Sequence, residues 1–368
     1  MSTAVRRIPF NALAPGEDAA AVEAAIRRVV ASGWFVLGPE VEAFEQEFAA
    51  ASGAAHAVGV GTGTDAITLI LRALDIGPGD EVITTPLSAA YSALAVLMAG
   101  ARPVFVDLDP ERLTLDPARV EAAITPRTRA LLPVHLYGQA ADMAPLETLA
   151  ARHGLALVED ACQAHLATAA GRPVGTIGVA GAFSFYPTKN LGAMGDGGAV
   201  ITGDAALAAR IRRLRNGGQT SRYHHLEAGA NSRLDEMQAA ILRARLPFLR
   251  GWTERRRALA AAYRRTLAGA PVRVPPELDH GHVYHLFPVL TSSRDALQAH
   301  LAAAGIETLI HYPVPIPAQP ALAASDPASC PIANRVCGEV LSLPLYPALP
   351  EADVLRAAAA VQAFQPVV

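Results

Sequence analysis

The stretch GAFSFYPTKNLGAMGDGGAVIT, residues 181–202, places the only lysine of the chain, Lys189, between two short runs that favour β-strand. Every other fixed positive side chain is an arginine. Arginine stays protonated at any ordinary pH, whereas a lysine amine can lose its proton and attack a carbonyl. Lys189 is therefore either a reactive amine or a residual surface lysine in an arginine-rich composition.

These two runs are the last of a series in which β-rich segments alternate with alanine-rich helical segments. The earlier runs are HAVGV (56–60), EVITT (81–85), RPVFVD (102–107), RALLPVH (129–135) and LALVED (155–160). Apolar residues at helical spacing predict two further helices, over about 19–30 and 39–50. The alternation predicts an α/β fold with a mainly parallel sheet between helices, in which ligands bind at the carboxyl ends of the strands.

The pattern changes near Leu246-Pro247, where a long arginine-rich helix begins. The run VYHLFPVL (283–290), another helix near 296–304 and a proline-rich stretch follow it. We expect a large domain over residues 1–250 and a smaller C-terminal α+β domain over residues 251–368.

The composition is that of a protein with a buried core. The hydrophobic fraction is 51%, and the formal net charge of -3 gives no electrostatic reason to bind nucleic acid or an anionic membrane. The uncharged run 82–101 contains Thr84, Thr85 and Pro86, so it reads as strand end, loop and buried helix. The three cysteines have no C-x-x-C spacing, and the N-terminus has no apolar signal segment. We expect a cytoplasmic protein with reduced thiols.

Several polar groups fall at the predicted strand ends. The segment GTGTDA (61–66) follows a strand and opens a helix, so its backbone N–H groups can bind a phosphate. As an isolated feature, an ordinary strand-to-helix turn is the better explanation. Ser184 comes shortly before Lys189 and can also donate to a phosphate.

The segment VEDACQAH (158–165) ends another strand with two carboxylates, which are costly to bury without partners. Asp160 can accept a hydrogen bond from a protonated ring nitrogen, or it can cap a helix. Gln163 can serve a neighbouring oxygen. Asn231 and Arg233 precede a strong helical pattern, where capping is the alternative role.

Together these groups form an aldehyde-binding site: a phosphate cradle, an acid for a ring nitrogen, and a lysine. Pyridoxal phosphate requires this set, with an aspartate against its pyridinium nitrogen. At this point the chain resembles the DegT/StrS family of pyridoxal-phosphate-dependent nucleotide-sugar aminotransferases. The fragments that carry the resemblance are IPFN, LGPEVEAFE, GTGTDAI, LPVHLYGQ, VEDACQAH, FSFYPTKNLGAMGDGGA, NSRLDEMQAAIL, HYPVP and LSLPLYP.

The resemblance implies the fold type I of pyridoxal-phosphate-dependent transferases, with the cofactor in the large domain. Lys189 is then the Schiff-base lysine, Asp160 the pyridinium partner and Gln163 a cofactor contact. The phosphate-binding residues it implies are Thr62, Gly63, Thr64 and Ser184. It also implies a homodimer with shared active sites, in which Asn231 contacts phosphate across the interface.

One departure from the family concerns the aromatic residue over the cofactor ring, because Ala89 occupies that position. Tyr91 is the candidate substitute. His225 and His311 resemble family positions near the sugar nucleotide, although either can be a hydrogen-bonded structural histidine. We expect no metal site in DHGHVYH (279–285), because His282 and His285 would point to opposite faces of a strand.

The implied reaction moves an amino group from an amino acid, L-glutamate in the family, to a keto group of a nucleotide-linked sugar. Family members that remove a sugar hydroxyl carry histidine in place of the lysine, so Lys189 favours transamination. The segment GTGTDA resembles members acting at sugar C3 more than those acting at C4. A non-catalytic, cofactor-binding regulator is the alternative from another class, which no basic DNA-binding segment supports.

Overall fold

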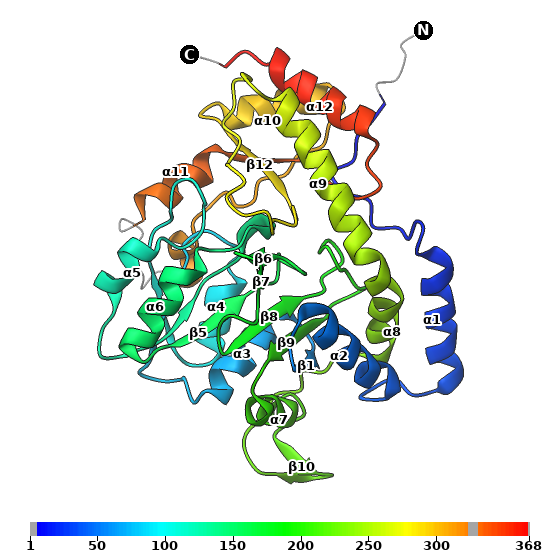
Figure 1. Cartoon of the computed structure of the whole chain (residues 1–368), viewed down its shortest axis with the longest axis vertical. Helices are drawn as coiled ribbons and strands as arrows, with labels where there is room; N and C mark the ends of the chain where they lie inside the picture. Colours follow the sequence, from blue (N-terminus) through cyan, green and yellow to red (C-terminus); the bar gives the residue numbers. More distant parts are fainter. Residues whose placement is uncertain (1–5, 323–329, 367–368) are drawn as a thin grey trace.

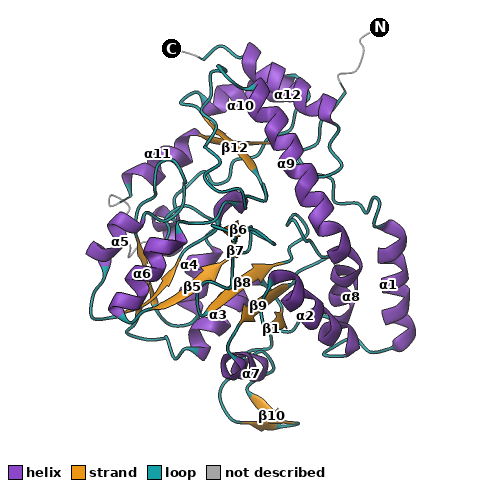
Figure 2. Ribbon diagram, in the orientation of Figure 1, coloured by secondary structure: helices purple, strands orange, loops and turns teal. Residues whose placement is uncertain are grey.

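The computed structural model describes residues 6–322 and 330–366. Its centre is a seven-stranded sheet with the strand order β1-β9-β8-β5-β4-β2-β3 (Figures 1 and 2). In chain order the strands are β1 (His56–Val60), β2 (Glu81–Thr84), β3 (Arg102–Phe105), β4 (Thr128–Leu132), β5 (Ala156–Asp160), β8 (Ala180–Ser184) and β9 (Gly198–Thr202). The pairs from β8 to β3 are parallel, and β9 is antiparallel to both of its neighbours. The predicted α/β fold with a mainly parallel sheet is confirmed.

Side chains along each strand alternate between two apolar cores, one on each face of the sheet. In β4, Leu131 packs in one core while Ala130 and Leu132 pack in the other. The first core includes side chains of α2 (Pro39–Ser52), α6 (Met143–His153) and α8 (Glu236–Arg245). The second includes side chains of α3 (Gly63–Ala73), α4 (Tyr91–Met98) and α7 (Ala205–Leu214). Burial on both faces explains why the strands read as continuous apolar runs.

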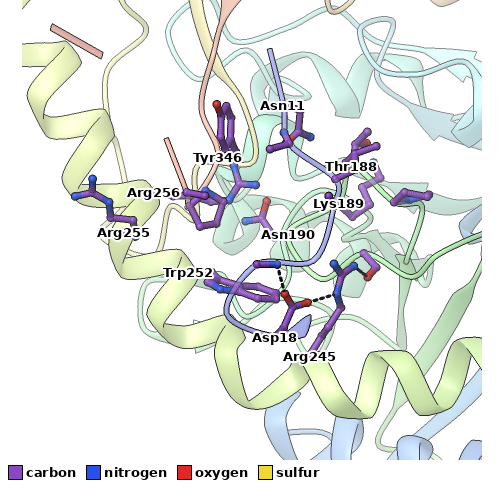
Figure 3. A pocket seen from close by; sticks show the side chains of 18 of the residues that line it. Asn11, Asp18, Thr188, Lys189, Asn190, Arg245, Trp252, Arg255, Arg256 and Tyr346 are labelled. Atoms are coloured by element: carbon purple, nitrogen blue, oxygen red, sulfur yellow. Dashed lines mark hydrogen bonds and ion pairs between the residues drawn. The ribbon is translucent and has the colours of Figure 1, made fainter. Parts of the chain in front are cut away.

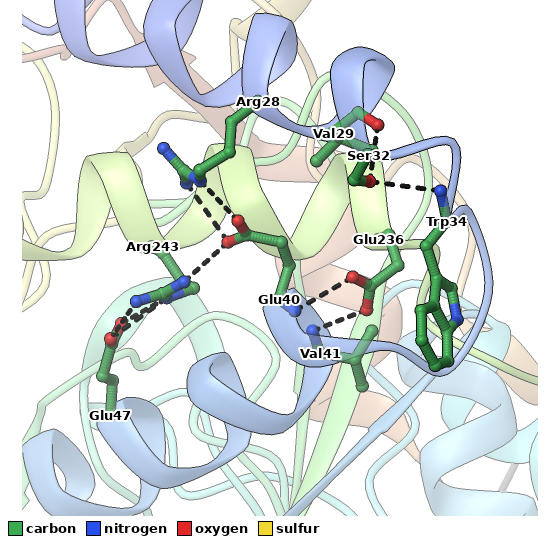
Figure 4. A network of polar contacts seen from close by, with 9 residues as sticks. All are labelled: Arg28, Val29, Ser32, Trp34, Glu40, Val41, Glu47, Glu236 and Arg243. Carbon is green, nitrogen blue, oxygen red and sulfur yellow. Dashed lines mark hydrogen bonds and ion pairs between the residues drawn. The ribbon is translucent and has the colours of Figure 1, made fainter.

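A carboxylate from a distant part of the chain fixes the start of α2 (Figure 4). Pro39 occupies the first turn, and Glu236 accepts hydrogen bonds from the N–H groups of Gly38 (2.9 Å), Glu40 (2.9 Å) and Val41 (2.8 Å). The Glu40 carboxylate in turn pairs with Arg28 of α1 (Ala19–Ser32) at 2.5 Å and with Arg243 of α8 at 2.6 Å. These contacts hold α1, α2 and α8 together.

The C-terminal part forms its own apolar core around a two-stranded antiparallel sheet of β12 (Phe287–Leu290) and β13 (Val340–Leu343). Its helices are α9 (Leu249–Thr266), α10 (Arg294–Ala303), α11 (Pro331–Glu339) and α12 (Glu351–Ala363). Ile8 forms a bridge with Ile306 and packs in this core, so the N-terminal segment joins the C-terminal unit. The division between residues 250 and 251 stays a prediction.

Shorter elements complete the described chain. They are α5 (Pro117–Ala123), the 3-10 turns η1 (Leu136–Gly138), η2 (Leu246–Phe248), η3 (Ile316–Ala318) and η4 (Pro320–Leu322), and the strand pairs β6 (Thr168–Ala169) with β7 (Arg172–Pro173) and β10 (Gln219–Ser221) with β11 (His224–His225). The β10–β11 ribbon extends beyond α7 at the edge of the molecule (Figure 1). Within residues 6–322 and 330–366, no helix is long and apolar enough to cross a membrane.

Candidate active site

The site forms where neighbouring strands end. Asp160 is the last residue of β5 and Ser184 the last of β8, and these two strands pair in parallel. Lys189 lies in the loop that follows β8, and its N–H donates to the Tyr186 carbonyl at 2.8 Å. The topology therefore brings these groups to one edge of the sheet, as predicted.

Asp160 is a buried carboxylate with two hydrogen-bond donors. Its Oδ2 accepts from the Ser92 hydroxyl at 2.6 Å, and its Oδ1 accepts from the Cys162 N–H at 3.1 Å. Residues 161–167 form turns and no helix, so the alternative role of Asp160 as a helix cap is wrong. Ser92, in the first turn of α4, was not identified from the sequence because its contact to Asp160 joins two distant segments.

Lys189 is half-buried, which does not fit a residual surface lysine. Burial lowers the pKa of its amine, because desolvation disfavours the charged form, and the nearby Cys162 and Asp160 act in the opposite direction. Lys189 also contributes to lowering the pKa of His311, although burial of the imidazole is the larger cause, and that pKa falls to about 4. Lys189, Asp160 and His311 therefore share one electrostatic environment.

A cradle for an anion lies at the start of α3. Thr62 caps this helix by accepting from the Asp65 N–H at 3.0 Å, and Gly63 and Thr64 lie in the first turn, whose N–H groups have no intrahelical partners. A Cβ at Gly63 would lie 2.7 Å from the Cys162 sulfur and 2.8 Å from the Ser184 Cβ. Only glycine allows this approach, which brings the turn beside Ser184.

Gln163 is held between two tyrosines. Its Oε1 accepts from the Tyr137 N–H at 2.8 Å, and its Nε2 donates to the Tyr312 hydroxyl at 3.0 Å. The Tyr137 hydroxyl donates to the His311 carbonyl, and the His311 Nδ1 lies 3.0 Å from the Ser342 hydroxyl. His311 is thus hydrogen-bonded and beside the site, and Tyr312 is a site residue that sequence reasoning missed.

Three predicted site residues are exposed to solvent in the single chain. Tyr91 is 64% exposed, and Asn231 and His225 are exposed as well. His225 lies on β11, where its Nδ1 donates to the Gly217 carbonyl at 2.6 Å. The N-cap of α8 is Asp235, so a capping role for Asn231 and Arg233 is wrong.

Beside Asn231, Ser232 connects to the start of α3. Its hydroxyl accepts from the Gly61 N–H at 2.9 Å and donates to Asp65 at 2.8 Å. The Asn231 backbone forms a bridge with Asn216, at the base of the β10–β11 ribbon. The segment that carries Asn231 is therefore fixed, while its side chain faces outward.

The assignment of DHGHVYH to a strand is wrong, because β12 begins only at Phe287. His282 accepts from the Tyr284 N–H at 2.9 Å and stacks on that ring, and burial lowers its pKa to about 3. His285 lies 3.3 Å from the Asn190 side-chain oxygen. The two histidines thus contact different residues, and His285 lies beside the lysine loop.

These residues fit pyridoxal phosphate. The glycine cradle at Gly63 with the N-terminus of α3 suits a phosphate, and the buried Asp160 carboxylate suits a protonated ring nitrogen. Lys189 supplies an amine whose lowered pKa favours the neutral, nucleophilic form.

Comparisons with known proteins agree with this chemistry. Residues 17–362 match the model of the DegT/DnrJ/EryC1/StrS aminotransferase family. The chain is 54% identical over 364 residues to dTDP-3-amino-3,4,6-trideoxy-alpha-D-glucose transaminase of Streptomyces venezuelae, which covers 97% of this chain and 96% of that relative. It is 46% identical over 338 residues to UDP-N-acetyl-3-dehydro-alpha-D-glucosamine 3-aminotransferase of Acidithiobacillus ferrooxidans, covering 92% of each.

The fold also matches a solved structure. The crystal structure of S. venezuelae DesV in complex with a ketimine intermediate has a TM-score of 0.94 at 54% identity, covering 97% of this chain and 98% of DesV. The resemblance found in the sequence is confirmed. The chain belongs to the DegT/DnrJ/EryC1/StrS aminotransferase family, and it is a pyridoxal-phosphate-dependent nucleotide-sugar aminotransferase.

Proposed function

We propose that this enzyme transfers the amino group of L-glutamate to a 3-keto group of a nucleotide-linked sugar. The observation that carries the transfer is that Lys189, in the loop after β8, lies within electrostatic range of the buried Asp160 at the end of β5. The C3 position is supported by two relatives whose names place the amino group there, at 54% and 46% identity. The 4-keto sugar is the alternative.

Each residue has a proposed part in this reaction. When bound, pyridoxal phosphate supplies an electron sink for the carbon that loses its proton. Lys189 would hold the cofactor through its amine, and the same amine, when free, would take and return the proton. Asp160 orients the ring and keeps its nitrogen protonated, with its own carboxylate held by Ser92 and Cys162.

The remaining contacts position the cofactor and sugar. Thr62, Gly63, Thr64 and Ser184 hold the phosphate, and Gln163, fixed by Tyr137 and Tyr312, contacts the ring. His311 contributes to the sugar-nucleotide subsite, where its lowered pKa keeps the imidazole neutral at neutral pH. Tyr91 remains our candidate for the aromatic cover of the ring.

We further propose a homodimer with shared active sites. In one chain, Asn231 and His225 are exposed, and the β10–β11 ribbon that carries His225 projects from the molecule (Figure 1). A second copy would receive this segment, so that Asn231 donates to the phosphate in the neighbouring site and His225 faces the neighbour's sugar nucleotide. The exposed Tyr223 and Leu226, at 79% and 62% exposure, give the ribbon apolar surface to bury.

An assay of substrate position tests the proposal. Purified enzyme with pyridoxal phosphate and L-glutamate is offered matched pairs of 3-keto and 4-keto nucleotide sugars, and aminated products are quantified by mass spectrometry. We expect the 3-keto members to have the higher kcat/KM. A preference for the 4-keto members would overturn the C3 assignment but leave the aminotransferase chemistry intact.

A further inference from the structure

A cavity borders the lysine loop (Figure 3). Its volume is about 570 Å³, within the range of roughly 300–1,000 Å³ typical of small-molecule sites. The cavity is lined by residues of segments 11–18, 187–192 and 346–348 and by the start of α9. Lys189 and Asn190 belong to the lining, whereas Asp160, Gln163 and Ser184 do not. The cavity is therefore adjacent to the active site and separate from the phosphate cradle.

The lining includes a buried arginine that has no acidic partner among residues 6–322 and 330–366. Arg256 is 4% exposed, and its Nη1 donates to the carbonyls of Leu345 (2.8 Å), Tyr284 (3.3 Å) and His285 (3.4 Å). Its Nε has no hydrogen-bond partner in the described structure. Burial lowers the pKa of this guanidinium to about 10, which leaves it charged at neutral pH. A buried charge without a counter-charge is costly, and an anion in the cavity would offset it.

One of the two acidic residues of the lining is paired with a positive charge, and the other is hydrogen-bonded to a neutral group. Asp18 accepts from the Arg245 Nε at 2.7 Å, and Glu17 accepts from the Trp252 indole N–H at 2.7 Å. Arg255, which also lines the cavity, donates to a backbone carbonyl. Besides the Asp18–Arg245 pair, the lining holds Arg255 and Arg256 against Glu17, so positive side chains are in excess.

We propose that this cavity binds a small carboxylate anion against the Arg256 guanidinium. A carboxylate matches the planar fork of donors that a guanidinium presents. The carboxylate can belong to the amino-acid donor or to an acid that does not react. Binding of the amino-acid donor in this cavity rests on the proposed function, whereas binding of a carboxylate as such does not.

The two tryptophans of the chain allow a direct test of binding. In a Trp34→Phe holoenzyme, Trp252 is the only tryptophan and lies in the cavity wall. Glutarate, a dicarboxylate with no amine to transfer, is titrated while Trp252 fluorescence is recorded. We expect a saturable change. We expect Arg256→Met to raise the Kd for glutarate by about tenfold or more, because a charge-assisted hydrogen bond is lost.

A second variant is needed, because Arg256→Met removes three carbonyl contacts and can prevent folding. A Cβ at Gly251, in the cavity wall, would meet nothing within 4 Å, so Gly251→Leu adds bulk there without a clash at its first atom. We expect it to weaken glutarate binding as well. Gly338, in α11 and outside the lining, also has open space for a Cβ, so Gly338→Leu is the matched control and should leave the Kd unchanged.

Kinetics then distinguish the two sources. If the donor occupies the cavity, Gly251→Leu raises the KM for L-glutamate and leaves the KM for the nucleotide sugar unchanged. If a non-reacting acid occupies it, the KM for L-glutamate is unchanged, and glutarate alters kcat of the wild type but not of Gly251→Leu. No saturable fluorescence change, or the same Kd in Gly251→Leu and Gly338→Leu, would overturn the site without bearing on sugar amination.

Discussion

Lys189 owes its proposed reactivity to where the fold places it. Desolvation lowers the pKa of its amine against the opposing effects of Cys162 and Asp160, so the neutral form is reached at a lower pH than in free lysine. Lys189→Arg keeps a positive charge in the same loop but removes the nucleophile. We expect this variant to lose turnover and the cofactor's covalent link, while circular dichroism shows an unchanged fold.

Borohydride reduction and peptide mapping check this expectation. In the wild type the label should lie on Lys189, and because it is the only lysine, the N-terminal amine is the one other primary amine that could carry it. Retained turnover in Lys189→Arg would show that another group performs the chemistry.

Ser92 is a positioning residue for Asp160, because its hydroxyl donates to Oδ2 at 2.6 Å inside the protein. Ser92→Ala should leave that oxygen without this donor and lower kcat by about tenfold, by analogy with the roughly 10–100-fold losses found for residues that orient metal ligands. Ser92→Thr keeps the hydroxyl and should restore most of the rate. Equal rates for the alanine and threonine variants would show that the hydroxyl has no such role.

Asp160→Asn tests the carboxylate itself. The amide is similar in size but cannot supply the negative charge that keeps a ring nitrogen protonated. We expect kcat to fall by far more than cofactor affinity, measured by absorbance titration with pyridoxal phosphate. A comparable loss in both quantities would assign Asp160 to cofactor binding alone.

At the scale of elements, the seven strands of the sheet were predictable because each is an apolar run bounded by turn residues. The starts of α1 and α2 were also predicted at the observed residues, Ala19 and Pro39. The strand assigned to His282 and His285 was wrong, since contacts to Tyr284 and Asn190 hold this segment as a loop. Ser92 and Tyr312 were missed for the same reason: long-range contacts, which no local pattern encodes, make them part of the site.

Glu236 illustrates a long-range contact that stabilises an element. Its two oxygens accept hydrogen bonds from three N–H groups at the start of α2, and Figure 4 shows the two from Glu40 and Val41. Glu236→Gln removes one acceptor oxygen and the negative charge at a helix N-terminus, and should lower the free energy of unfolding by about 1–3 kcal/mol. Urea denaturation at one protein concentration measures the change. Glu42→Gln, an exposed acid in the same helix turn, is the control and should have a smaller effect.

At the scale of the whole molecule, a single chain leaves part of the predicted site unassembled. Asp160, Gln163, Ser184 and Lys189 lie together, whereas Asn231 faces outward from a segment fixed by Ser232. Large apolar side chains are also exposed, among them Trp34 at 56% and Tyr223 at 79%. A symmetric dimer would bury such surface and bring each Asn231 to the neighbouring phosphate.

Mixed dimers test this arrangement. Asn231→Asp puts a carboxylate beside the neighbour's phosphate, where like-charge repulsion weakens cofactor binding, and Lys189→Ala inactivates the site of its own chain. In a mixed dimer one site then carries both defects and the other carries none. After subunit exchange of equal amounts, about a quarter of all sites should be intact, so activity should return from two inactive parents. Mass spectrometry confirms that mixed dimers have formed. If these mixed dimers stay as inactive as the parents, Asn231 acts in its own chain, because both chains then carry a damaged site.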